Sequence, residues 1–545
     1  MITSRRTLLA GFALLVALAL TFFSPPARAV VLRSEIPGAH FKANDAAQVE
    51  LNRVKSRLRQ NNLSGAYQAG LAAIQKDSLS AEVFDVLGGI YMRQRRFRAA
   101  FQAYEHAAVL APDQAPIWNR LAQVSFLQLG LEEEGKKSLE YALAADSLFG
   151  TAWYTKCVYH WTRAELGEAD KAIERARAVE QDQSRSYLWW STSLGLMLSR
   201  GDYNGAYEGL KLHLYQVPND LSARQHMAQA LRGLGRDREA AEALHYLLAQ
   251  DPDQPVWAVE MGLVQRALGN RDSALVFFQR ASRRDSLSFD AGYNITLERL
   301  AAGDTARAWT MLRTLRRVDP TNYLVPLLAS RIHREEGDTA QARLAFDEAR
   351  RLNPAAGLAS ATRAGGSPLP AWSSPELEAA EQLIERGEFS LAGDKLYQAA
   401  GDPLRRPAAL YWLSRTIRVN RGAPGLPVLA ARAGSEASGG DPILVRTYAE
   451  ALWAAGDTLR TISALENVRK TSPHDLIGAS LLAESLLSIG EAPAARQIFT
   501  EIAQEPTRSW RVESVRAEVL SAAKDAGSSI ARSRAAASDY LPAPL

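Results

Sequence analysis

The chain has 545 residues, of which 47% are hydrophobic and 23% are charged, a composition that excludes a polytopic membrane protein and a mostly disordered chain. Its single cysteine, Cys157, excludes an internal disulfide framework and any multi-cysteine metal site. Three arginines of the first 29 residues contribute most of the net charge of +4. The remainder is nearly neutral and lacks the basic surface that nucleic-acid binding requires.

Residues 1–29 have the plan of a secretory signal peptide. Two arginines precede an apolar run over residues 8–23, and the sequence Ala27-Arg28-Ala29 follows it. The run is shorter than the ~20 residues that span a bilayer. We therefore expect cleavage after Ala29, no transmembrane segment in the mature chain, and a periplasmic or secreted bacterial protein. The paired arginines leave both the general and the twin-arginine export routes open.

A period of 34 residues follows the leader. It is marked by glycines in two runs, namely Gly201, Gly235, Gly269, Gly303 and Gly337, then Gly422, Gly456 and Gly490. With this glycine at position 15 of each unit, positions 4, 7, 8 and 11 form an apolar helical stripe with a small residue at position 8. A second stripe pairs alanine at position 20 with a bulky residue at position 24, and proline at position 32 ends it. Each unit is thus a predicted helix–turn–helix that must stack on its neighbours to bury its apolar face.

One unit, residues 81–114, carries the whole pattern. Its matching residues are Phe84, Leu87, Gly88, Tyr91, Ala100, Tyr104, Ala107 and Pro112. In these residues and their spacing the chain resembles the tetratricopeptide repeat (TPR) family. The resemblance implies an all-α fold, an α-solenoid of stacked helix–turn–helix repeats whose concave groove binds peptides or partner domains. It carries no information about the identity of the ligand.

The repeats fall into two predicted arrays. An N-terminal extension (30–46) precedes nine units over residues 47–356, a Gly/Ser/Pro linker (357–372) follows, and four units occupy residues 373–509. Two units, 115–149 and 150–186, carry one and three extra residues, and the unit 408–441 has two prolines where its second helix should start. We expect a capping helix over 510–525 and a disordered tail over 526–545. Whether the linker is a hinge stays open.

Several motifs imitate catalytic or metal-binding sites. Residues 130–137 resemble a phosphate-binding loop but lack its hydroxyl residue, and the three glutamates at 132–134 are interpreted as a solvated turn. The Ser521–Lys524 motif lacks the companion motif of serine–lysine enzymes. Cys157 and His160 form at most half a metal site, and Cys157 stands at a core position. We therefore predict no catalytic residue, cofactor or metal, and no enzyme.

Tryptophans cluster in the middle of the first array, at Trp153, Trp161, Trp189 and Trp190. A carbohydrate platform is one interpretation of such a cluster. Aromatic residues at repeat positions are more typically core residues, which is the interpretation we favour.

The candidate partner-binding residues lie on the helix face opposite the apolar stripe. In the family this face lines the concave groove. Here it supplies Gln225, His226, Gln229, Arg232, Arg266, Tyr293, Asn294, Arg331 and Arg334. Three of these arginines share position 12, which predicts a line of guanidinium groups suited to acidic partners. A solvated face is the alternative, because arginine is abundant throughout the chain.

The sequence therefore predicts an exported scaffold that mediates protein–protein interactions in the bacterial cell envelope. Two alternatives remain. A polysaccharide-binding or export-assembly component would place aromatic and arginine side chains against anionic sugars. A subunit of an envelope-modifying enzyme would need a cleft with polar residues of shifted pKa. The partner, the pathway and the oligomeric state stay open.

Overall fold

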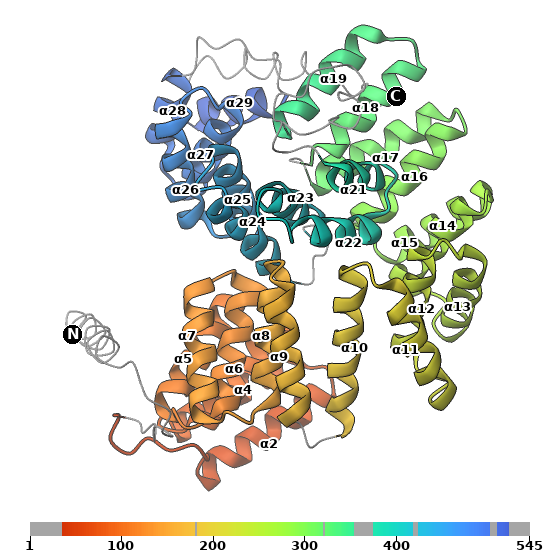
Figure 1. Cartoon of the computed structure of the whole chain (residues 1–545). Coiled ribbons are helices and arrows are strands. Elements are labelled where there is room, and N and C mark those ends of the chain that lie inside the picture. The colour runs from red at the N-terminus through yellow and green to blue at the C-terminus, as the bar shows by residue number, and fades with distance from the viewer. Residues whose placement is uncertain are drawn as a thin grey trace.

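The structure is a computed structural model and describes residues 35–179, 183–319, 322–353, 374–417, 423–501 and 510–522. All regular elements in these ranges are helices, and the bridge between His40 and Ser80 is isolated. Consecutive helices pack as antiparallel pairs, so the predicted all-α solenoid of TPR-type repeats is confirmed (Figure 1). The predicted leader, the linker 357–372 and the tail 526–545 lie outside the described residues.

The first four helix pairs form one block at the N-terminal end. They are α2 (Asp45–Arg59) and α3 (Leu63–Lys76), α4 (Ala81–Arg93) and α5 (Phe97–Leu110), α6 (Ala115–Gln123) with η1 (Val124–Leu129) and α7 (Glu132–Ala145), and α8 (Gly150–Thr162) and α9 (Leu166–Val179). The helix α2 starts two residues inside the expected extension 30–46, because the Asn44 side chain caps it by accepting the Ala47 N–H.

Five further pairs complete the first array. They are α10 (Gln183–Ser199) and α11 (Tyr203–Gln216), α12 (Leu221–Gly233) and α13 (Asp237–Gln250), α14 (Pro255–Ala267) and α15 (Arg271–Arg284), α16 (Phe289–Ala301) and α17 (Thr305–Val318), and α18 (Leu324–Glu335) and α19 (Thr339–Leu352).

The second array has four pairs and a final helix. They are α21 (Pro375–Glu385) and α22 (Phe389–Ala399), α23 (Arg406–Ile417) and α24 (Gly425–Ala437), α25 (Pro442–Ala454) and α26 (Thr458–Thr471), α27 (Leu476–Ser488) and α28 (Ala492–Glu501), and α29 (Trp510–Ala522). The helix α29 packs on α27 and α28, where it covers the last repeat. None of the described helices combines the length and the apolarity that a membrane crossing needs.

The pairing within a repeat follows from the small residue at position 8. A side chain at Gly88 would collide with the ring of Tyr104, which stands at position 24 of the same unit. Gly262 and Phe278 repeat this relation five units further along the array. The aromatic ring therefore fills the space that the missing side chain leaves, and the two helices cross closely.

The extra residue of the unit 115–149 is absorbed by a π-helix. The segment η1 continues α6 with wider turns and ends at Gly130, whose φ is +58°. A π-turn accommodates one additional residue without breaking the helix. The insertion thus leaves the stacking of α7 and α8 intact.

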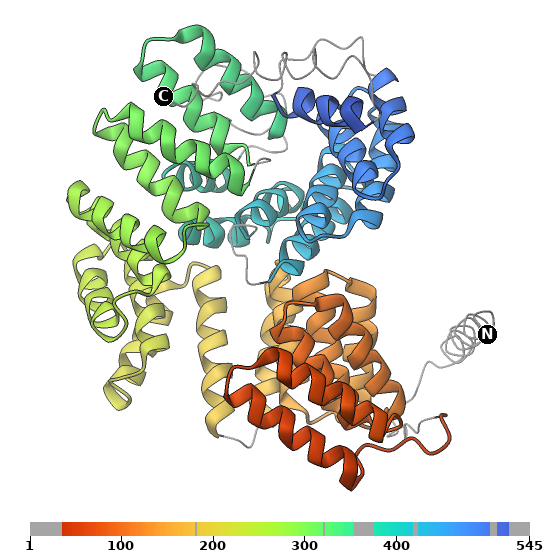
Figure 2. The ribbon, with the colours of Figure 1, turned by 180° about the vertical axis from the view of Figure 1, so that it is seen from behind.

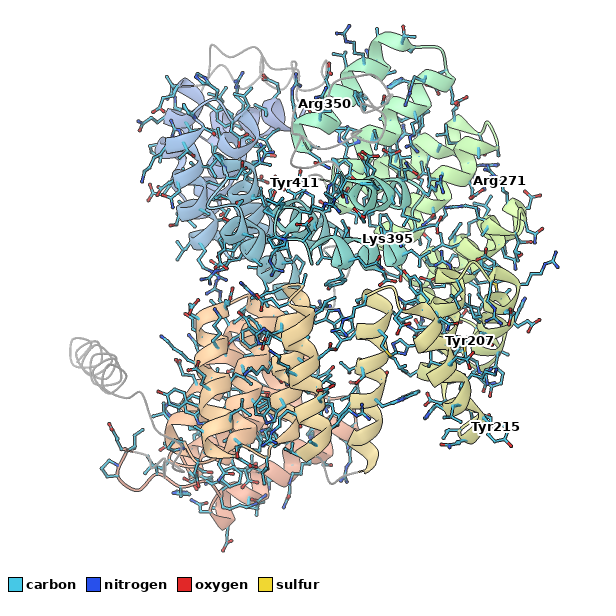
Figure 3. All side chains as sticks on the ribbon, viewed as in Figure 1. Tyr207, Tyr215, Arg271, Arg350, Lys395 and Tyr411 are labelled. Carbon is cyan, nitrogen blue, oxygen red and sulfur yellow. The ribbon has the colours of Figure 1, made fainter. Side chains whose placement is uncertain are left out.

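The two predicted arrays share one hydrophobic core. The largest buried cluster runs from Phe289 on α16 through Tyr323 and Tyr411 to Phe499 on α28. The helices α21, α22 and α23 cross the middle of the molecule between α16–α19 and α24–α29, as both views show (Figures 1 and 2). Figure 3 places Lys395 of α22 and Tyr411 of α23 in this central region, whereas Tyr215 projects at the far end of α11 and is 86% exposed.

A second contact joins the first block to the second array. The guanidinium of Arg460 donates to the carbonyls of Leu129 (2.8 Å) and Gly130 (2.9 Å), at the end of η1. Arg406 donates to the carbonyls of Arg163 (2.7 Å) and Ala164 (3.2 Å), at the end of α8. Helix ends carry carbonyls without intrahelical partners, so each arginine fork satisfies two of them across a long sequence separation.

Candidate binding cleft

The turn between α21 and α22, residues 385–388, lies against the concave face of the first array. We call it the docking turn. Side chains of α12, α14, α16 and α18 contact it. The predicted groove residues therefore meet a segment of their own chain.

The backbone carbonyls of the docking turn are bound one after another. Tyr293 Oη donates to the Glu385 carbonyl (3.0 Å). Arg266 Nη1 donates to the Arg386 carbonyl (2.5 Å), and Asn294 Nδ2 donates to the Gly387 carbonyl (3.2 Å). These carbonyls end α21, where the helix dipole is negative and intrahelical donors are missing. The three side chains thus recognise a helix C-terminus.

The side chains of the docking turn form ion pairs with the predicted arginine line. Arg331 pairs with Glu385, and Arg232 Nη2 lies 3.1 Å from Glu388 Oε2. Arg232 also pairs with Glu260, and it is 7% exposed. Burial lowers the pKa of Arg232, but the carboxylates of Glu260 and Glu388 outweigh burial. The pKa of Arg232 is therefore raised above its ordinary value. Removing either acid would leave a buried cation partly uncompensated.

The remaining candidate residues are distributed around this contact. His226 and Gln229 line a cavity next to the docking turn. Gln225 is exposed and accepts a hydrogen bond from Trp257 Nε1 (2.8 Å). Arg334, although it shares position 12 with Arg232 and Arg266, is exposed. The structure therefore gathers Arg232, Arg266, Tyr293, Asn294 and Arg331 at the docking turn and separates Gln225 and Arg334 from it.

The cavity beside the docking turn has a volume of about 680 Å³. We call it the binding cleft. It lies between the concave face of α12, α14 and α16 on one side and α22 and α23 on the other, and Trp161 and Gly195 also line it. Its apolar lining comes mainly from Val256, Val259, Leu287, Phe389, Tyr397 and Leu413. The volume is within the usual range of ligand sites, ~300–1,000 Å³.

Four carboxylates line the binding cleft, and its lining includes no lysine or arginine. They are Glu260, Asp285, Asp290 and Asp394. Glu260 forms an ion pair with Arg232, which is not part of the cleft lining. Asp394 is 4% exposed and accepts a hydrogen bond from Tyr203 Oη (3.2 Å). Asp290 accepts one from Asn294 Nδ2 (2.8 Å). Neutral donors thus serve two carboxylates that face the cavity.

Burial dominates the electrostatics of these two acids. Burial raises the pKa of Asp290 to about 7, with a further increase from Glu260, while Asn294, Arg232 and Arg266 act against it. Burial also raises the pKa of Asp394 to about 7, although Tyr203 and Gln229 donate hydrogen bonds to it. Both groups change charge near neutral pH.

Sequence reasoning did not single out Glu260, Asp290 or Asp394. Asp290 stands at position 2 of its unit, one of the inner-face positions, so the same rule applied to acidic residues would have found it. Asp394 lies on the second helix of a repeat, and only the packing of α22 against α11 and α12 brings it to the cleft.

The structure tests two interpretations from the sequence, that the glutamates at 132–134 are solvated and that Cys157 is a core residue. The glutamates at 132–134 are not all solvated, which corrects our expectation. Glu132 is 1% exposed, accepts a hydrogen bond from Tyr159 Oη (2.7 Å) and pairs with Arg163 (2.8 Å) and Arg432 (3.4 Å). It is buried because α24 packs onto η1 and α8. Cys157 is fully buried, and desolvation raises the pKa of its thiol to about 12.

The tryptophans are divided between core and surface. Trp189 is 1% exposed and packs in the core with Cys157, whereas Trp161 lines the binding cleft and donates to Ser199 Oγ (3.1 Å). Within the described ranges, no group of three or more His, Cys, Asp and Glu side chains is arranged to hold a metal ion.

Comparisons with known proteins give distant similarities. No family model matches the chain. A "Putative cellulose synthase operon protein C" from Escherichia coli O157:H7 is 28% identical over 249 residues, which are 42% of this chain and 20% of that protein. The chain therefore spans about a fifth of the length of this relative.

Among solved structures, a tetratricopeptide repeat protein from Parabacteroides merdae is 17% identical, with 44% of this chain and 94% of that chain covered and a TM-score of 0.39. Yeast Tom70 is 13% identical, with coverages of 90% and 97% and a TM-score of 0.26. These similarities are low, and the assignment of the fold rests on the helix pairs themselves.

Proposed function

We propose that this protein is an exported TPR scaffold that binds other proteins in the bacterial cell envelope through the binding cleft. The observation that carries the proposal is the cleft itself, an open cavity of about 680 Å³ held between the concave face and α22–α23. Rigid stacked helices on both sides fix its shape, which lowers the entropic cost of binding. The expected signal peptide at 1–29 supports the proposed location.

The proposal includes no catalytic role. The protein acts by presenting a preformed surface, and the docking turn holds that surface in one geometry through Tyr293, Asn294 and Arg266. No cofactor is part of this mechanism.

In-cell photocrosslinking tests the proposed function. A photoreactive amino acid replaces Val256, which is 53% exposed and lines the cleft, and in a matched variant it replaces Val276, which is 57% exposed and lies on α15 outside the cleft lining. The proposal predicts one envelope protein captured from position 256 and not from position 276. Equal capture from both positions, or none from position 256, would contradict it.

A polysaccharide-related role is the second candidate. It is favoured by the name of the relative, which refers to a cellulose synthase operon, and by the aromatic residues Trp161, Phe389 and Tyr397 in the cleft lining. Binding of soluble cello-oligosaccharides to the purified protein, lost when Trp161 is replaced by alanine, would support this candidate over a protein partner.

The third candidate, a subunit of an envelope-modifying enzyme, gains one observation. It requires a cleft with polar residues of shifted pKa, and the pKa values of Asp290 and Asp394 are both raised to about 7. Release of reducing ends from envelope polysaccharide, abolished in an Asp394→Asn variant, would establish it.

A further inference from the structure

The predicted arginine line and the open cavity have opposite charges. Arg232, Arg266 and Arg331 are engaged by the docking turn and by Glu260 and Glu298. What remains accessible beside them is lined by four carboxylates and by no lysine or arginine. An acidic partner would have to displace the docking turn, whereas a basic partner meets the cleft as it stands.

The cleft carboxylates have room for a cationic partner. Asp394 is 4% exposed, faces the cavity and has the phenol hydroxyl of Tyr203 as a hydrogen-bond donor. Asp290 has the amide of Asn294. A carboxylate taken from water into a protein interior is stabilised best by a cation that donates hydrogen bonds to it. Neither acid has such a partner among the ion pairs of the described residues.

The rest of the lining suits the stem of a long basic side chain. Val259, Phe389, Tyr397 and Leu413 supply apolar surface within the cleft. Val256 and Leu287 also line it, and they are 53% and 52% exposed. Arginine and lysine bury an aliphatic stem against such surface while the charged end reaches polar groups. Flanking apolar residues of a peptide would cover the two exposed side chains.

We propose that the binding cleft takes up an arginine or lysine side chain from an apolar segment of a partner protein, with Asp290 and Asp394 as its acceptors. The inference deepens the proposed scaffold function and rests on it for the identity of the partner as a protein. Charge complementarity and the apolar lining select this occupant over an acidic peptide or a neutral glycan.

Direct binding to the purified full-length mature protein tests the inference. The probe is a short capped peptide with one arginine between leucines, measured by calorimetry at pH 8. Its control replaces arginine by citrulline, which keeps the shape and removes the charge. We expect the citrulline peptide to bind at least about tenfold more weakly, a difference of ~1.4 kcal/mol.

Variants of the cleft provide the second arm. The double variant Asp290→Asn and Asp394→Asn should weaken binding of the arginine peptide by about tenfold or more. Asp272→Asn, at an exposed residue in the first turn of α15, should leave it unchanged. The pair of peptides requires no folded variant, so the test remains decisive if the double variant fails to fold.

Several outcomes would overturn the inference. Equal binding of the two peptides, tighter binding of a glutamate-containing analogue, or no binding of the arginine peptide at roughly millimolar concentration would each do so. Displacement of the bound peptide by a cello-oligosaccharide that binds more tightly would assign the cleft to sugars. Site-specific capture from position 256 combined with charge-independent peptide binding would retain the scaffold function and refute only the basic ligand.

Discussion

Two neighbouring regions of the concave face differ in charge and in what covers them. At the docking turn, Arg266, Tyr293 and Asn294 of the first array donate to three carbonyls at the end of α21, and two arginines pair with glutamates of the same turn. At the binding cleft, carboxylates face an open cavity. Both regions use the same inner face of the repeats, so the difference arises from which helix of the second array lies opposite. The comparison teaches that a solenoid groove can be occupied in part by its own chain.

The largest expected effect is a loss of stability caused by disrupting the docking turn. Replacing Arg232 by alanine leaves Glu260 and Glu388 without their shared cation, which should cost about 3–5 kcal/mol in the free energy of unfolding. Arg334→Ala is the matched control, because it stands at the same repeat position and is exposed; its cost should stay within ~0.5 kcal/mol. Urea unfolding followed by circular dichroism measures both. Equal midpoints for the two variants would show that the docking turn is not held by this ion pair.

The next effect concerns the open region and has the opposite sign. The pKa of Asp394 in the folded protein, about 7, is above the ordinary value of 3.8 for an aspartate, so folding favours the protonated form of this side chain. The resulting destabilisation is complete above pH 7 and disappears as the pH falls toward 3.8. The groups that face Asp394 are Tyr203, Gln229, Glu260 and Lys395.

Asp394→Asn should therefore stabilise the protein at pH 8, by an amount on the order of 2 kcal/mol. The difference between the variant and the unmodified protein should shrink as the pH is lowered from 8 to 5. Thermal unfolding across this range provides the measurement. A variant that is less stable at pH 8, or a difference that does not depend on pH, would contradict the raised pKa.

A pair of glycines sharpens the role of the docking turn. Gly387 and Gly337 both have positive φ, +74° and +81°, so alanine is strained by ~1–2 kcal/mol at either position. A Cβ atom at Gly387 would also collide with the Asn294 side chain, whereas at Gly337 it would meet nothing. We expect Gly387→Ala to cost about 1–2 kcal/mol more than Gly337→Ala. Identical unfolding midpoints would mean that Asn294 does not contact the turn.

The smallest expected effect lies at the second contact between the first block and the second array. Arg98 pairs with Asp457 at 3.0 Å, but its side chain is 66% exposed. Exposed ion pairs contribute little, so Arg98→Ala should lower the stability by less than about 0.5 kcal/mol. Differential scanning calorimetry resolves this from the larger losses. A destabilisation as large as that of Arg232→Ala would mean that this contact, rather than the docking turn, contributes most to holding the two arrays together.

The repeat architecture could be predicted because its determinants are local and periodic. Gly88 and Tyr104 are sixteen residues apart, and the same relation recurs in Gly262 and Phe278, so the sequence pattern contains the contact. The docking turn could not be predicted in this way. Arg266 and the Arg386 carbonyl are 120 residues apart and belong to units without a shared register.

The candidate site was partly accessible from the sequence. The inner-face rule selected Arg232, Arg266 and Tyr293, and arginine chemistry indicated an acidic counterpart; the structure places Glu385 and Glu388 of the same chain there. Of the four cleft carboxylates, Asp394 comes from α22, and the position of this helix follows from tertiary packing rather than from any repeat position.

A zero-length cross-link tests the central claim most directly. In an Arg331→Lys variant the new amine would lie beside the Glu385 carboxylate, and a carbodiimide joins an amine to a carboxylate only in direct contact. The exposed pair Lys171–Glu168 (2.7 Å) serves as the internal positive control. The account predicts a cross-linked peptide between positions 331 and 385, identified by mass spectrometry. Cross-linking at the control pair without any product between 331 and 385 would contradict the self-occupied groove.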